Sequence, residues 1–373
     1  MQKETISRPS IIDALTTGLG TAARRPWLLI VPFTIDLLLW LAPKVSIATL
    51  MQRLLRGWET LVRATYSASQ LEVMAEMLET VREGMTRLGA QVNLLDTLAG
   101  SWLGPPSAVA MDQVSRLNFI SELLLAPVGL IPESVKLAAA PWQAPPIEAQ
   151  SFLVVLLLIA ALWLVAQVVA VCWLRWVASA VLRPAEATPP ATPATPVAPA
   201  AGDWTQGVIQ VIQLIGFCLF LGILMFALRL PLGAAVVLLL LSGSPLTGFM
   251  FALVAGVTLW ITLWMLLSLY FTSEGLLFER QPVWRSMLQG ATMMRGNITA
   301  TLGLISLINL LLVGFRAVWG IIGQTPAGGL VALAGNAYLA TAMLLAVFTY
   351  YGGLRKQWLA AVEKQQAGKQ VDK

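Results

Sequence analysis

The chain has 373 residues, of which 57% are hydrophobic and 12% are charged, with no histidine and a formal net charge of +5. This composition holds far more apolar surface than a soluble core of this length could use, so it indicates a protein that crosses a membrane several times. The positive charge is small and dispersed, with no basic run interleaved with aromatic residues, and this pattern excludes nucleic acid as an expected partner.

Six apolar segments reach or approach the length of about 20 residues that a helix needs to cross a hydrocarbon core about 30 Å thick. A further apolar stretch within 231–247 is too short to cross and is bracketed by proline and glycine, so we expect a re-entrant or interfacial piece there. The predicted fold class is all-α, a polytopic integral membrane protein in the lipid bilayer. The six predicted spans are 27–42, 151–176, 207–230, 248–271, 298–322 and 330–351.

Residues 1–42 are predicted to form a cytoplasmic amphipathic helix and the first span, which carries Asp36. A carboxylate near the middle of the bilayer costs about 2.5–3.5 kcal/mol on insertion scales and is expected to have a partner. Two interpretations stay open: Asp36 titrates or binds a cation during transport, or it is a neutral or ion-paired residue that locks two helices together. Arg316, in the fifth span, either pairs with Asp36 or extends its long side chain to the outer interface.

Residues 43–150 are predicted to form an extracytoplasmic helical insertion. One helix face in it repeats apolar residues in alternating steps of three and four. This face packs against the preceding helix or the outer leaflet, or else it binds a membrane protein partner. The flanking positions lack the charges that usually set coiled-coil pairing, which favours the first of these interpretations. The face consists of Leu71, Met74, Leu78, Val81, Met85, Leu88, Val92 and Leu95.

The second span lies in 151–184 and leads into 185–204, a stretch rich in proline, alanine and threonine. Such a composition predicts a semi-extended cytoplasmic linker between two membrane halves. Basic residues outnumber acidic ones in the segments on the linker side of the membrane, whereas 43–150 holds more acidic than basic residues. The positive-inside rule therefore predicts a multi-pass protein of the cell inner (cytoplasmic) membrane with cytoplasmic N- and C-termini.

The second half, 205–356, is predicted to hold four spans and a cytoplasmic in-plane helix at 273–296, followed by a cytoplasmic tail at 357–373. The in-plane segment combines apolar residues with three arginines that are candidate contacts for lipid headgroups. Simple anchoring at the interface and a specific lipid site both remain open. The three arginines are Arg280, Arg285 and Arg295.

The two halves share a weak internal similarity. The stretch Ile35-Asp36-Leu37-Leu38-Leu39 matches Ile308-Asn309-Leu310-Leu311-Leu312, and each follows an amphipathic segment and a basic residue. Asn309 is thus the counterpart of Asp36 and a candidate polar site. Either the chain contains a duplicated unit, as is common in membrane proteins, or two leucine-rich spans resemble each other by chance.

The second of these units has a pattern of its own before an apolar span. It lies in 271–312 and includes Phe278, Trp284, Ser286, Met287, Gly290, Arg295, Gly296 and Asn297. This pattern resembles a family of six-helix bacterial inner-membrane proteins, which includes the membrane domain of some glycerophosphodiester phosphodiesterases. The resemblance covers about a third of the chain and implies a six-span fold with a link to lipid or envelope upkeep. The soluble phosphodiesterase domain is absent, so hydrolase activity is not carried over.

Catalytic chemistry finds little support in the residues. Without histidine there is no zinc-binding pair, catalytic triad or imidazole base, and both cysteines lie in apolar runs without a base or metal-ligand partners. No catalytic residue, cofactor or metal is therefore expected. The predicted function is a non-catalytic structural, assembly or accessory protein of the cytoplasmic membrane; the alternative is a transporter or exporter of a lipid-like or hydrophobic solute that uses Asp36.

Overall fold

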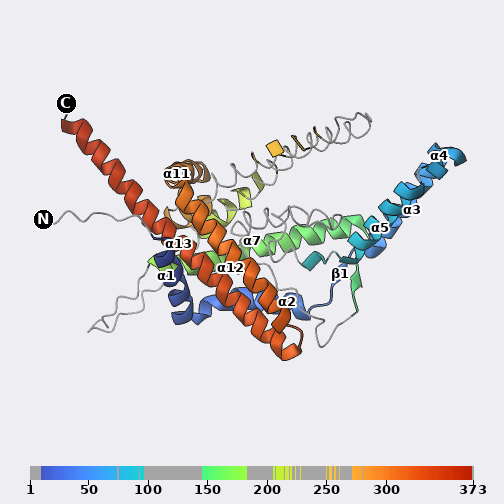
Figure 1. The fold of residues 1–373 in the computed structure, drawn as a ribbon, viewed down its shortest axis with the longest axis horizontal. Helices are drawn as coiled ribbons and strands as arrows, with labels where there is room; N and C mark the ends of the chain where they lie inside the picture. Colours follow the sequence, from blue (N-terminus) through green and yellow to red (C-terminus); the bar gives the residue numbers. More distant parts are fainter. Residues whose placement is uncertain are drawn as a thin grey trace. The chain divides into compact units, whose positions relative to one another are not determined.

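The computed structural model describes residues 10–73, 75–91, 93–95, 145–182, 271–279 and 281–371, with scattered positions between 205 and 260. These residues are almost entirely helical (Figure 1). The chain divides into two compact units, which we describe separately. Unit 1 comprises Met1–Leu28, Val171–Ile308 and Thr341–Lys373, and unit 2 comprises Leu29–Ala170 and Asn309–Ala340.

Three helices in the described ranges are long and apolar enough to cross a membrane: α7 (Phe152–Leu182), α12 (Ile298–Ile322) and α13 (Pro326–Val371). α12 and α13 contain the fifth and sixth predicted spans, and α7 covers the second predicted span except for its first residue. Many large side chains of α7 are exposed, which suits a helix surrounded by hydrocarbon rather than water. The structure thus supports a helical membrane protein.

The remaining predicted spans are described in part or lie outside. The first consists of a short 3-10 helix, η1 (Pro26–Leu29), followed by α2 (Ile30–Leu41), and is apolar but shorter than the other three. The third contains a short apolar helix at Gly207–Phe217. Most of the fourth span, the linker at 185–204 and the stretch at 231–247 lie outside the described residues.

Helix α1 (Ile11–Arg24) begins in unit 1 at Ser10, whose Oγ accepts a hydrogen bond from the backbone N–H of Asp13 at 3.3 Å. Its buried face has small residues, and Gly18 lies so close to α13 that a Cβ there would collide with the carbonyl oxygen of Ala342. Glycine at this position therefore sets how closely the two helices pack. The buried residues of α1 are Ala14, Leu15, Gly18 and Ala22.

The segment expected to be one in-plane helix consists of two helices in unit 1, α10 (Thr272–Glu279) and α11 (Val283–Arg295). Pro282 separates them: it is the extended N-cap residue of α11, and its ring disfavours a helical conformation of the preceding residue. Helix α10 is largely buried and does not form an exposed apolar surface. Ser286 Oγ of α11 donates a hydrogen bond to the carbonyl oxygen of Thr272 at 2.7 Å.

Unit 2 contains a helical hairpin made of α3 (Ala48–Thr65), α4 (Ala68–Val73) and α5 (Ala75–Gln91). Helices α3 and α5 lie side by side. The described side chains of the predicted apolar face are half-buried, as expected for a face that packs within the chain. They are Leu71, Leu78, Val81, Met85 and Leu95, whereas the side chains of Met74, Leu88 and Val92 lie outside the described set.

The base of this hairpin is held by a feature that periodicity does not predict. Strand β1 (Val45–Ser46) pairs in parallel with β2 (Ile147–Glu148), so the two ends of the predicted insertion lie side by side. The Oδ1 atom of Asn93 accepts a hydrogen bond from the backbone N–H of Val45 at 3.0 Å and ties the end of α5 to the same point. A small apolar cluster, which includes Ile47, Leu50, Leu94 and Val155, packs beneath it.

Candidate functional site

The candidate site is a buried polar pair in unit 2, formed by Asp36 of α2 and Asn336 of α13. Asp36 is only 1% exposed, and its Oδ2 accepts a hydrogen bond from Nδ2 of Asn336 at 2.9 Å. Its other carboxyl oxygen, Oδ1, is buried and makes no hydrogen bond within the described part of the chain. The carboxyl group is therefore enclosed by protein, with one amide donor.

Glycines bring the helices of this site close together. Asp36 and Trp40 are four residues apart on α2, and Gly329 and Asn336 are seven apart on α13, so each pair lies on one helix face. A Cβ on Gly329 would lie 2.9 Å from the indole of Trp40, which shows that the ring covers the glycine. The indole and the carboxyl of α2 thus contact one face of α13.

A second tryptophan packs on the neighbouring turn of α13. The indole of Trp319, from α12, lies against Gly335, where a Cβ would approach ring atoms to 2.9 Å or closer. Gly335 directly precedes Asn336, so α13 is contacted by α12 beside the residue that binds Asp36. The unit 2 segments of α2, α12 and α13 therefore pack around the polar pair, with two indoles on two glycines.

This arrangement limits the chemistry that the described residues support. In the described part of the chain, no group of three or more His, Cys, Asp or Glu side chains is placed to hold a metal ion. A lone carboxyl with one amide donor can hold a proton or fix the register of two helices. A proton relay needs a further acid or base within reach.

The partner of Asp36 is a residue that the sequence analysis missed. Asn309 and Arg316 lie on α12, but their side chains fall outside the described set, so their contacts with Asp36 stay untested. Asn336 had a signal of its own, because it is the single amide in the predicted span at 330–351, which has no charged residue. An amide at such a depth needs a hydrogen-bond partner as much as a carboxyl does.

The candidate headgroup contacts lie in unit 1. Arg285 and Arg295 are exposed on α11, whereas Arg280 lies outside the described residues. The exposed side of α11 also carries Trp284, which is 66% exposed, and Leu288, which is 52% exposed. This face therefore combines large apolar side chains with two guanidinium groups.

Comparison with known proteins adds no relative. A scan against protein-family models, a search of curated proteins and a search of solved structures each found no match. The function is therefore inferred from the geometry of the chain itself.

Proposed function

We propose that this protein is a non-catalytic structural, assembly or accessory component of the cytoplasmic membrane, with a link to lipid or envelope upkeep. The observation that carries the proposal is the enclosure of Asp36, which is 1% exposed and hydrogen-bonded to an amide of another helix. A carboxyl that serves a transported solute must be reachable by that solute, whereas one that locks helices is best covered by packing.

The proposal includes a topology of six spans in two related halves, with both termini in the cytoplasm and 43–150 outside. The burial pattern of α1 and α11 supports the relation between the halves, because both amphipathic helices bury residues at steps of four around one glycine. These residues are Ala14, Gly18 and Ala22 in α1 and Ser286, Gly290 and Met294 in α11.

The exposed face of α11 supports an attachment to the cytoplasmic leaflet. Trp284 and Leu288 suit the boundary between headgroups and acyl chains, and Arg285 and Arg295 suit anionic headgroups. Each arginine near an anionic surface contributes about 1 kcal/mol, which is enough to hold a helix at the interface. Such attachment requires no lipid specificity, and it fits an accessory role.

The competing function is transport of a lipid-like or hydrophobic solute through Asp36. One observation favours it: the Oδ1 atom of Asp36 has no hydrogen-bond partner in the described part of the chain. Buried polar atoms without partners are rare and often mark functional positions. The two functions differ in whether the negative charge of Asp36 is needed, which a neutral isostere can decide.

The test is native mass spectrometry of the full chain released from its own membranes under mild conditions, for the wild type and for Asp36→Asn. We expect both proteins to carry the same protein subunits in the same stoichiometry, because the asparagine retains the hydrogen bond to Asn336. Asp13→Asn is the matched control, since Asp13 is exposed on α1. A single chain that carries one recurrent lipid, lost only in Asp36→Asn, would overturn the proposal in favour of transport.

A further inference from the structure

The two arms of the α3–α5 hairpin expose opposite charges. On α3 the exposed ionic side chains are Arg53, Arg56 and Arg63, and the single acid of this helix is Glu59. On α4 and α5, Glu72, Glu79 and Glu83 are exposed, and so is Arg82, which pairs with Glu59 and Glu79. Steps of three and seven residues place the arginines along one side of α3, and a step of four places Glu79 and Glu83 along one side of α5. The hairpin therefore has a basic stripe on one arm and an acidic stripe on the other.

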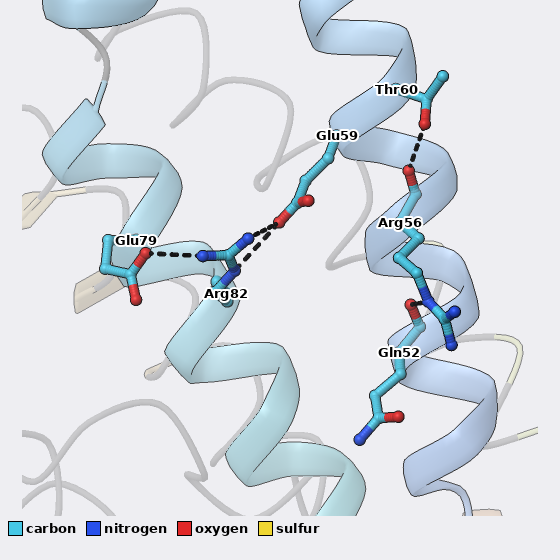
Figure 2. A network of polar contacts seen from close by, with 6 residues as sticks. All are labelled: Gln52, Arg56, Glu59, Thr60, Glu79 and Arg82. Atoms are coloured by element: carbon cyan, nitrogen blue, oxygen red, sulfur yellow. Dashed lines mark hydrogen bonds and ion pairs between the residues drawn. The ribbon is translucent and has the colours of Figure 1, made fainter.

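Among the described side chains, a single ion pair joins the two arms, and it leaves these stripes on the outside. Glu59 and Arg82 reach across the space between α3 and α5 and meet at 2.8 Å, as Figure 2 shows. Arg56 and Glu79 lie outside that space, on the two different arms (Figure 2). Arg82 also makes a longer contact with a second acid, Glu79, at 3.3 Å. The side chain of Glu79 is still 59% exposed. Both stripes are thus accessible to a partner.

The Glu59–Arg82 contact also sets the heights of the stripes, because the two helices run in opposite directions. Arg63 lies four residues towards the tip from Glu59, and Glu79 lies three residues towards the tip from Arg82. At ~1.5 Å per residue their heights differ by about 1.5 Å. Arg56 and Glu83, on the base side, differ by about 3 Å. Arg56 and Arg63 therefore each have an acid of the other arm close to their own height, within the reach of these side chains.

We propose that this hairpin binds a second copy of the same chain, with the basic stripe of α3 in one copy against the acidic stripe of α5 in the other. The inference rests on the proposed placement of the insertion on one side of the membrane. Copies embedded in one membrane are related by rotation about its normal, so their hairpins meet at equal heights. Arg63 then faces Glu79, and Arg56 faces Glu83.

Charge complementarity selects this partner over a membrane surface. An anionic leaflet would attract the arginines of α3 but repel the glutamates of the adjoining arm. A second copy neutralises both stripes at once.

The experiment uses two full-length copies with different tags, co-expressed, extracted in mild detergent at low salt and captured through one tag. Variant A is Arg56→Glu with Arg63→Glu, and variant B is Glu79→Arg with Glu83→Arg. We expect capture of the copy that carries the other tag to fall about tenfold when both copies are variant A or both are variant B, because like charges then oppose each other. Capture is expected to return to the wild-type level when A is paired with B. The same is expected for two copies of the fourfold swap, the variant that carries all four substitutions.

This design contains its own control for net charge and folding. A and B shift the net charge in opposite directions, and the fourfold swap restores it, so only a direct contact explains recovery in the mixture. Failure of wild-type copies to capture each other, or failure of the A with B mixture to recover, overturns the inference. A loss of vesicle binding in A without loss of capture would instead assign the arginines to the leaflet. The structural role is tested separately, by native mass spectrometry. If that experiment finds subunits of other proteins, the proposed structural role holds whichever capture result is obtained.

Discussion

Removing the amide partner of Asp36 is expected to destabilise unit 2 more than removing the charge. In Asn336→Leu the carboxyl, which is 1% exposed, loses its one described donor at 2.9 Å. A buried polar group left without a partner costs about 1–3 kcal/mol. In Asp36→Asn the side-chain oxygen can still accept from Asn336, and the new NH₂ occupies the place of an oxygen that has no partner. We therefore expect Asp36→Asn to change stability by no more than about 0.5 kcal/mol.

Thermal unfolding of the purified protein in detergent, followed by intrinsic tryptophan fluorescence, measures the difference. With about 2–4 °C per kcal/mol for a cooperative unit of this size, Asn336→Leu should lower Tm by roughly 2–12 °C, and Asp36→Asn should leave it within about 2 °C. The double variant Asp36→Leu with Asn336→Leu should recover most of the loss, since no polar group is then left unpaired. The coupling energy should be about 0.6 kcal/mol and no more than about 1.7 kcal/mol, the mean and the maximum found for hydrogen bonds between membrane helices.

The reasoning would be refuted if Asp36→Asn lowered Tm as much as Asn336→Leu. Such a result would mean that the negative charge itself is required, and it would point to a cation or guanidinium partner. Arg316→Gln would then identify that partner if it produced the same loss as Asp36→Asn.

Two further predictions concern packing and the base of the hairpin. Gly18→Ala should destabilise unit 1 by about 1–3 kcal/mol, because its Cβ would lie against the backbone of Ala342. Gly20→Ala is the control, since the added Cβ meets nothing within 4 Å. In the same unfolding assay it should be neutral or stabilising by up to about 1 kcal/mol. Asn93→Ala removes the acceptor for the Val45 backbone N–H and should raise the rate of limited proteolysis in the hairpin several-fold without changing the rate in the C-terminal tail.

The long apolar helices were predictable because the bilayer sets their length. The fifth predicted span has the same bounds as α12, Ile298–Ile322. Helix α7 begins one residue after the start of the predicted second span. The sixth span continues far beyond its predicted end, since α13 runs to Val371. Hydropathy locates the apolar part, whereas the lysine, glutamine, alanine and glutamate residues that follow are good helix formers and extend the helix past it.

Contacts between distant residues were not predictable from periodicity. Asp36 drew attention because a carboxyl in an apolar run is costly, but its partner lies 300 residues further along the chain. Strands β1 and β2 have two residues each, too short for an alternating pattern to be recognised. Pro282 did carry a local signal that 273–296 would be interrupted, because proline fixes the backbone where a new helix starts.

Helix association within a membrane explains why polar side chains in this chain serve as ties. Apolar surfaces gain little by meeting in lipid, so helices associate through close packing at small residues and through hydrogen bonds. In unit 1, Trp173 Nε1 donates to the carbonyl oxygen of Leu28 at 2.8 Å, and Arg25 donates to that of Ala180, in the last turn of α7, at 2.9 Å. Asp36 and Asn336 make the same kind of tie in unit 2. Each of these hydrogen bonds joins segments that are far apart in the sequence, and so fixes one helix segment against another.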